Sequence, residues 1–293
     1  MKRGYAFGVM LVLSGGVCLS ISGILLRNVE SADGWQLLFY RGVSFFITLF
    51  LIIFLRYRGR TLQAFHAVGT RGIWVALVLG AGSVCYVFAI LLTTVANAVF
   101  IIGAAPLVTA IAGWLFLKEK ITAAGVLAML VAVAGIGLMF TDGFLAGRWL
   151  GNVMAVFVVL SFAAMLVLLR GARNVDMLPA TCMAGLVAAA IAGFMAADLI
   201  LSRNDLVIAI LLGSVQFTGG FMFITIGTRY VPAAEVALFS LSEAVLAPIW
   251  VWIGVNEVPS VLTLCGALVV SAAVIIHSIV GIRRERAAAL VGA

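Results

Sequence analysis

ANAVFIIGAAPLVTAIAGWLFLKEKIT, residues 96–122, returns in a weakened form as AEVALFSLSEAVLAPIWVWIGVNEVPS, residues 234–260. At a constant offset of 138 residues, Trp114 aligns with Trp252 and a glutamate near the end of each segment aligns with its counterpart. Both segments begin with small residues and carry a proline in their apolar part. An internal repeat of this kind indicates that the chain consists of two related halves.

The composition around these segments is that of an integral membrane protein. Of the 293 residues, 65% are apolar and only 10% are charged, whereas soluble domains carry roughly 25% charged residues. A soluble globule could not cover its surface with so few polar side chains. Disorder, collagen-like repeats and disulfide scaffolds are excluded by the same composition.

Ten apolar stretches are long enough to cross the roughly 30 Å of bilayer hydrocarbon as helices. They do not alternate between apolar and polar residues as the strands of a membrane barrel would. The predicted spans are 5–26, 35–55, 72–92, 97–117, 122–140, 149–169, 179–201, 206–227, 233–254 and 260–280.

The distribution of basic residues predicts the orientation in the membrane. With a cytoplasmic N-terminus, 14 of the 18 Lys and Arg residues fall in cytoplasmic segments, three fall outside and Arg41 lies within the second span. This is a strong positive-inside pattern. It predicts that both termini are cytoplasmic, and we expect the protein in the inner (cell) membrane of a bacterium. The net charge of +7 is thereby explained without a nucleic-acid partner.

The repeat divides the chain into residues 1–141 with five helices, residues 149–281 with five helices, and a cytoplasmic tail at 282–293. Because each half has an odd number of spans, the second half enters the membrane from the opposite side. Inverted repeats of this kind are typical of secondary transporters, which bind substrate near the membrane midplane between the repeats. The predicted fold is therefore an all-α integral membrane protein of ten helices in two inverted five-helix repeats.

The two repeat segments, FYRG at 39–42 and YVPAAEVALFSLSEAVLAP at 230–248 resemble the EamA family of the drug/metabolite transporter superfamily over nearly the whole chain. This resemblance implies a ten-helix carrier, and many such carriers export amino acids or other small metabolites. The family usually has Glu-Pro where this chain has Glu243-Ala244. That departure predicts a helix break that is weakened, or moved to Pro248.

Glu243 and Arg41 are the charged residues that the spans place at membrane depth. A carboxylate there is costly unless it faces a wet cavity, pairs or stays protonated, so Glu243, flanked by Ser240 and Ser242, is the foremost candidate for binding substrate or a coupling proton. Arg41 can hold a carboxylate in bidentate geometry. The alternatives are a protonated Glu243 that bonds to a neighbouring helix and only holds the packing, an Arg41 that snorkels to the headgroups, and an ion pair between the two.

Further candidates lie in both halves, and among them Asn97 and Glu235 occupy matched positions of the repeat. Tyr86 and Gln216, each close to glycines, are expected either to contact substrate or to join helices by hydrogen bonds. Asn97 and Glu235 suit a pair of gates at opposite mouths, although capping of helix N-termini is the favoured alternative for both. Proline frees backbone carbonyls inside a span, where they can line a cavity or merely accompany a kink; these prolines are Pro106 and Pro248.

The favoured function is secondary active transport of a small metabolite, an amino acid or similar zwitterion, by alternating access and in the direction of export. The alternative substrates are organic cations and drugs, and the alternative classes are a channel and an intramembrane enzyme. No P-loop, no HExxH and no cluster of metal ligands occurs in the sequence, so no cofactor and no metal are expected. The expected partners are the lipid bilayer, a small-molecule substrate and protons as candidate coupling ions, with the protein a monomer or a homodimer.

Overall fold

The computed structural model describes residues 4–93, 95–139, 149–256, 258 and 260–291, and every regular element in this part of the chain is helical. The elements that form the membrane spans are α1 (Tyr5–Ser20) with α2 (Ser22–Arg27), α3 (Gly34–Tyr57), α5 (Gly69–Leu92), α6 (Val95–Gly103) with α7 (Ala105–Leu117), α8 (Ala123–Met139), α9 (Trp149–Gly171), α10 (Leu178–Met195), α11 (Arg203–Leu211) with η3 (Leu212–Phe217) and α12 (Thr218–Gly227), α13 (Ala233–Ser240) with α14 (Ser242–Val255), and α15 (Val261–Val291). The short helices η1 (Arg58–Arg60) and α4 (Thr61–Ala67) follow α3.

These elements confirm the ten predicted helices. Within the described residues, nine are long and apolar enough to cross a membrane, and the tenth, α8, is a shorter apolar helix of 17 residues. At 1.5 Å per residue α8 is still about 26 Å long. The seventh span is shorter than expected, since α10 ends at Met195 rather than near residue 201. The predicted linker between the halves, 141–148, lies outside the described residues.

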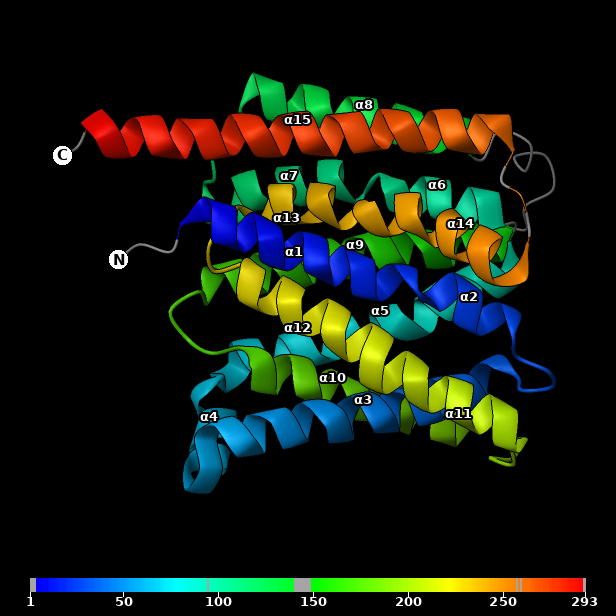
Figure 1. Ribbon diagram of the computed structural model, residues 1–293. Helices are drawn as coiled ribbons and strands as arrows, with labels where there is room; N and C mark the ends of the chain where they lie inside the picture. Colours follow the sequence, from blue (N-terminus) through cyan, green and yellow to red (C-terminus); the bar gives the residue numbers. More distant parts are fainter. Residues whose placement is uncertain (1–3, 94, 140–148, 257, 259, 292–293) are drawn as a thin grey trace.

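The helices pair across the two halves as a pseudo-twofold axis requires. Helix α3 packs on its counterpart α10, α8 packs on α15, and α7 packs on α13. Two further contacts between the halves, α5 with α9 and α12 with α1, exchange under the same symmetry. Figure 1 shows that α1 and α9, which begin the two halves, run in opposite directions, and that both termini lie at one end of the bundle. We call this end the terminal face.

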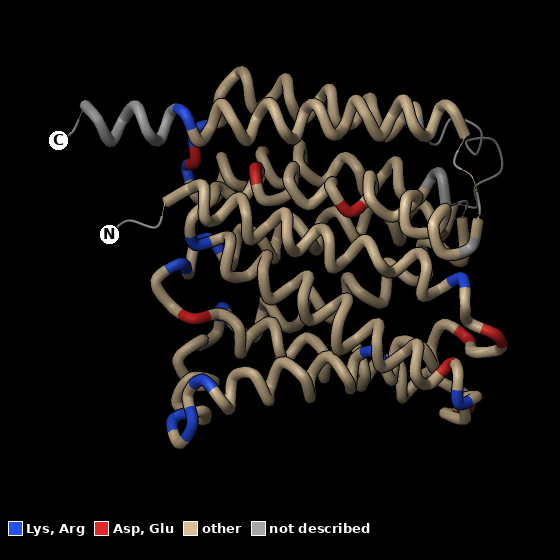
Figure 2. The backbone as a smooth tube through the Cα atoms, in the orientation of Figure 1, with Lys and Arg blue, Asp and Glu red and all other residues tan. Residues whose placement is uncertain are grey.

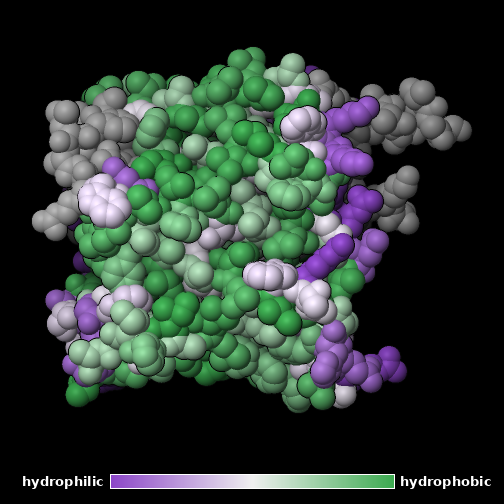
Figure 3. Space-filling model, turned by 180° about the vertical axis from the view of Figure 1, so that it is seen from behind, coloured by the Kyte–Doolittle hydropathy of each residue, from purple (hydrophilic) through white to green (hydrophobic). Residues whose placement is uncertain are grey.

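The outer surface is apolar, as contact with the hydrocarbon of a bilayer requires. Large apolar side chains are exposed along its helices, among them Phe116 and Leu268, each 71% exposed. In the view of Figure 3 an apolar zone fills the middle of the molecule, and hydrophilic residues gather towards its two edges. Most basic positions lie at the terminal face (Figure 2), which is the pattern that the positive-inside rule associates with the cytoplasm.

Four spans are interrupted, and the interruptions position the candidate site. The first breaks at Ile21 between α1 and α2, the fourth at Ala104 between α6 and α7, and the ninth at Leu241 between α13 and α14. The eighth contains the π-helical turn η3. The expectation that the break in the ninth span moves to Pro248 is wrong, because Pro248 lies inside α14. The break occurs two residues before Glu243, where the backbone N–H groups of Leu241 and Ala244 bond three residues back.

Asp205, at the start of α11, ties the second half to the loop between α2 and α3. Its fully buried carboxylate accepts hydrogen bonds from the backbone N–H groups of Glu30, Ser31 and Ala32, at 2.8–3.0 Å. We expect Asp205→Ala to lower the free energy of unfolding by about 3 kcal/mol, because it leaves buried donors without an acceptor. Thermal unfolding in detergent measures this. The control is Asp198→Ala, at an exposed carboxylate that also accepts two hydrogen bonds. Equal losses in the two variants would contradict the prediction.

Candidate functional site

The candidate site lies where the break at Leu241 meets α1. A side chain at Gly16 would overlap the hydroxyl of Ser242 and approach the backbone nitrogen of Glu243 to 3.5 Å. Gly16 therefore allows α1 to come directly against the start of α14. The Ser242 hydroxyl is buried and has no hydrogen-bond partner among the described residues. A buried polar group without a partner requires an explanation, and a ligand that supplies the missing bond is one.

The carboxylate of Glu243, like the Ser242 hydroxyl, has no bonding partner among the described residues. It lies in the first turn of α14 and is half-buried. Among the described residues it forms no ion pair and no hydrogen bond. A carboxylate at this depth without a cation is costly. The interpretation that Glu243 pairs with Arg41 is therefore wrong for this structure, as is the interpretation that it joins neighbouring helices.

Arg41 lies two turns into α3 and is 9% exposed. Its guanidinium donates one long hydrogen bond, from Nη2 to the carbonyl oxygen of Ser83 at 3.3 Å, and lies over the ring of Phe217 at 4.7 Å from the centroid. A guanidinium has five N–H donors, so most of them have no acceptor among the residues that the structure describes. The side chain points inward, and the snorkelling alternative does not hold.

Tyr86 lies within electrostatic range of both charged groups. It is half-buried in the middle of α5, and its hydroxyl interacts electrostatically with both Glu243 and Arg41. The three side chains come from three different helices, α3, α5 and α14. They therefore form one electrostatic neighbourhood in the interior of the bundle, with an acid and a base that do not neutralise each other.

The turn η3 completes this neighbourhood from the eighth span. Gln216 donates from Nε2 to the carbonyl oxygen of Leu19 at 3.2 Å, just before the break in the first span. Its Oε1 is buried and has no partner in the described part of the chain. One end of the Gln216 amide therefore joins two helices, as one of the two interpretations expected. Contact of the other end with substrate stays a prediction. π-Helical turns are frequent at functional sites.

Gly213 lets η3 lie directly on α3 beside Arg41. A methyl group there would overlap the Arg41 carbonyl oxygen and the Ser44 hydroxyl, and would lie 2.9 Å from the backbone nitrogen of Phe45. We expect Gly213→Ala to destabilise the fold by about 1–3 kcal/mol through overpacking. Thermal unfolding is the measurement. The matched control is Gly59→Ala, where an added methyl group meets nothing within 4 Å. The prediction is refuted if Gly213→Ala loses no more stability than Gly59→Ala.

The two halves of the ninth span differ in how deeply they are buried. In α13, all residues except Glu235 are buried, whereas every residue from Ser242 to Val251 is half-buried, on all faces of α14. A helix with one lipid face and one packed face would instead alternate between exposed and buried residues. The span is thus tightly enclosed on the terminal-face side of Glu243 and loosely packed on the other.

The other predicted site residues lie elsewhere or serve the backbone. Ser240 donates its hydroxyl to Val236 of its own helix at 2.8 Å. Pro106 is the second residue of α7, just after the break at Ala104. Glu235 does not cap α13, because its carboxylate accepts from the hydroxyl of Tyr5. The side chain of Asn97 lies outside the described residues.

Two features of this region could not be read from the sequence. Phe217, which stacks on Arg41, is one of 19 phenylalanines and has no distinguishing context. Glu119 takes the capping role expected of Glu235, since its Oε2 accepts from the backbone N–H of Ala233 while its Oε1 binds Arg170 at 2.8 Å. In the sequence, Glu119 is marked only by its position near the end of the first repeat segment, 96–122.

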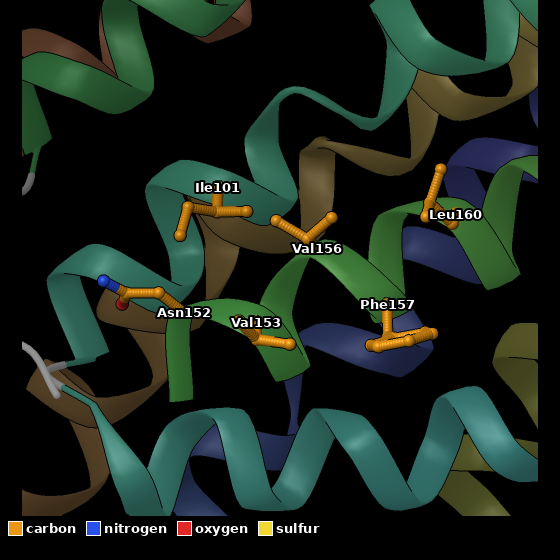
Figure 4. Close-up of a pocket in the computed structure, with 6 residues that line it drawn as sticks. All are labelled: Ile101, Asn152, Val153, Val156, Phe157 and Leu160. Atoms are coloured by element: carbon orange, nitrogen blue, oxygen red, sulfur yellow. The ribbon is translucent and has the colours of Figure 1, made fainter. Parts of the chain in front are cut away.

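A hollow lies on the outer surface between α6 and α9. It has a volume of about 300 Å³ and is lined by Ile101, Asn152, Val153, Val156, Phe157 and Leu160 (Figure 4). Its lining is apolar, and the amide oxygen of Asn152 accepts from the Thr93 hydroxyl at 2.8 Å. Phe157 and Leu160 are about half exposed on the hydrocarbon-facing surface. This hollow offers no charge or free polar group to a metabolite, and we do not place the substrate there.

Comparison with known proteins decides the class of this molecule. The model of the EamA-like transporter family matches the chain twice, over residues 6–141 and 149–279. The chain belongs to the EamA-like transporter family. It is therefore a membrane transporter, and the two matches are its two EamA repeats.

Among the solved structures that share the fold of this EamA-family chain, one serves here for comparison. It is described only as the crystal structure of a protein, is 14% identical in sequence, and superimposes with a TM-score of 0.79 over 93% of this chain and 97% of the other. At that identity the likeness shows the fold alone. None of the curated proteins compared with the chain matches it.

Proposed function

We propose that this EamA-family transporter is a secondary active exporter of a small zwitterion, an amino acid or a close analogue, with Glu243 and Arg41 as the two poles of its binding site. The observation that supports this most directly is that both charged groups lie in the interior and have no charged partner among the described residues. Each unpaired charge at this depth is costly, and a zwitterion supplies both missing charges at once.

The roles follow from the chemistry of each group. The Arg41 guanidinium, oriented by Phe217 and Ser83, binds the substrate carboxylate through two parallel N–H donors. The Glu243 carboxylate receives the substrate ammonium. Tyr86, the Ser242 hydroxyl and the free Oε1 of Gln216 complete the polar lining. A proton on Glu243 replaces the ammonium when substrate is absent, which makes this residue the candidate for proton coupling.

The two inverted halves provide the transport cycle. Related halves with opposite topology can interconvert between a state open to one side and a state open to the other. The enclosed α13 and the loosely packed α14 agree with a state that is closed towards the terminal face and accessible from the opposite face. With the basic terminal face in the cytoplasm, as the positive-inside rule predicts, this is an outward-facing state.

The second candidate function is export of an organic cation, for which Glu243 alone would supply the counter-charge. The largely unsatisfied guanidinium of Arg41 argues against it, since a buried positive charge repels a cationic substrate. Nothing in the described structure favours a permanent pore or a catalytic centre over a carrier.

Counterflow in liposomes that contain the purified protein tests the proposal. Vesicles are preloaded with an unlabelled mixture of amino acids and then given traces of labelled amino acids outside. A carrier accumulates label transiently above the external concentration, whereas a channel only equilibrates it. We expect accumulation with amino acids and none with labelled tetraethylammonium; the reverse result would replace the zwitterion by an organic cation.

A further inference from the structure

A second cluster of titratable side chains lies at the terminal face, apart from the candidate site. It centres on Glu235, the third residue of α13 and eight residues before Glu243, which is roughly 12 Å along a helix axis. Glu235 Oε2 accepts from the hydroxyl of Tyr5, at the start of α1, and Glu235 Oε1 lies 3.4 Å from Nε2 of His277 in α15. We call these three residues the terminal triad.

The terminal triad joins both halves of the transporter. Tyr5 belongs to the first half, whereas Glu235 and His277 belong to the second. The His277 side chain is 5% exposed and that of Glu235 is 22% exposed. The Nε2 atom of His277 is buried and has no hydrogen bond in the described part of the protein, so its approach to Glu235 is an ion pair whenever the imidazole is protonated. His277 is thus a buried ionisable group that contacts Glu235 of α13.

In the part of the chain that the structure describes, few other charged groups lie near the triad. Helix α13 presents Glu235 and the ring of Phe239, whose centroid lies 6.0 Å from that of His277. Helix α8 presents Gly125, which is uncharged. A cavity of about 30 Å³ separates Glu235 from Glu119 and Lys120, which is room for about one water molecule. Glu119 is already paired with Arg170, so Glu235 is the acid that responds to His277.

We propose that His277 and Glu235 form a proton-binding site whose occupancy holds the transport path closed at the terminal face. This inference rests on the proposed alternating-access function, since it supposes that α13 separates from α1 and α15 when that face opens. A protonated His277 places a positive charge against the carboxylate that also holds Tyr5, and charge-assisted contacts of this kind are the strong ones.

The direction of the pH effect follows from this arrangement. The closed state contains the imidazolium–carboxylate pair and the open state does not, so a proton is bound more tightly in the closed state. Low pH at the terminal face therefore stabilises the closed state, and this stabilisation is lost as the pH rises and the ion pair loses its proton. Because linkage is reciprocal, opening at this face releases a proton there.

Thiol accessibility of α13 tests the proposal without any substrate. In protein whose Cys18, Cys85, Cys182 and Cys265 are replaced, Ala237→Cys places a probe at a position in α13 that is 1% exposed. Leu62→Cys, on α4 and 71% exposed, reports the intrinsic effect of pH on a thiol. The measured quantity is the ratio of the two labelling rates with a polar maleimide in detergent, between about pH 5.5 and about pH 8.

We expect this ratio to rise roughly fivefold with pH, because a factor of about five corresponds to the free energy that a partly buried ion pair contributes. His277→Gln and Glu235→Gln are each expected to abolish the rise, while His66→Gln, at the exposed histidine of α4, leaves it intact. Tyr5→Phe should raise the ratio at every pH and keep the slope. A flat ratio with His277 and Glu235 present, or a full rise in both Gln variants, would overturn the proton site. A failure of amino-acid counterflow with the pH response intact would refute the proposed substrate alone.

Discussion

Replacement of Glu243 by Gln is expected to reduce amino-acid counterflow by roughly 30- to 100-fold, the cost of losing a hydrogen bond to a buried charged group. The carboxylate has no ion-pair partner among the described residues, so its charge is available to the substrate ammonium. The amide has nearly the same shape as the carboxylate, so the substitution removes the charge with little change in side-chain volume. Initial counterflow rates of the two proteins in liposomes measure the effect.

The matched control is Glu30→Gln, the same change at an exposed glutamate in the loop before α3. It is expected to leave counterflow within about twofold of the parent, as is usual for surface substitutions. Thermal unfolding of both variants shows whether they are folded. If a folded Glu243→Gln protein carried amino acids as fast as the Glu30→Gln protein, Glu243 would not be a pole of the binding site.

Replacement of Arg41 by Gln is expected to raise the half-saturating amino-acid concentration by roughly 10- to 100-fold, since the substrate carboxylate loses a charge-assisted contact. The same variant should be as stable as the parent or more stable, because the buried guanidinium makes only one long hydrogen bond, at 3.3 Å, and its desolvation is costly. Concentration-dependent counterflow and thermal unfolding together measure the two effects.

Arg41→Lys is the matched control for charge. It keeps the positive charge but loses the planar fork of donors, so its half-saturating concentration is expected to lie between those of the parent and of Arg41→Gln. An Arg41→Gln protein that unfolds at a much lower temperature would instead indicate that Arg41 holds the fold together. Unchanged affinity in both variants would remove Arg41 from the site.

The membrane spans and the repeat could be predicted because both depend on long-range composition. Twenty apolar residues in a row leave a chain little choice but to cross the membrane as a helix. The offset of 138 residues also holds for local detail, since Lys118 and Asn256 both take the left-handed conformation that ends α7 and α14. The α7 and α14 ends therefore repeat even where the residues differ.

The position of the helix break could not be predicted from the prolines. Leu241 and Ala244 both have N–H groups and could continue a regular helix, yet the backbone there takes the tighter three-residue bonds. The reason lies in the contact with α1, where Gly16 leaves room for Ser242. Pro248, in contrast, is accommodated inside α14. A break fixed by a neighbouring helix leaves no local sequence signal.

The candidate site was predictable residue by residue but not as an arrangement. Charge at membrane depth singled out Glu243 and Arg41, and the glycines directed attention to Gln216 and Tyr86. Which of these residues face one another depends on helix rotation, which the nearly uniform apolar sequence does not encode. For the same reason Glu235 was expected to cap its own helix, whereas it contacts Tyr5 and His277 on two other helices.

The central claim is that substrate recognition needs both an ammonium and a carboxylate, and competition in counterflow tests it most directly. Uptake of a labelled amino acid by the unaltered protein is measured against three unlabelled competitors: the same amino acid, the amine that lacks its carboxylate, and the acid that lacks its ammonium. The binding site described here predicts that only the intact amino acid competes at low concentration. Equal competition by the amine would contradict the account and assign the substrate site to Glu243 alone.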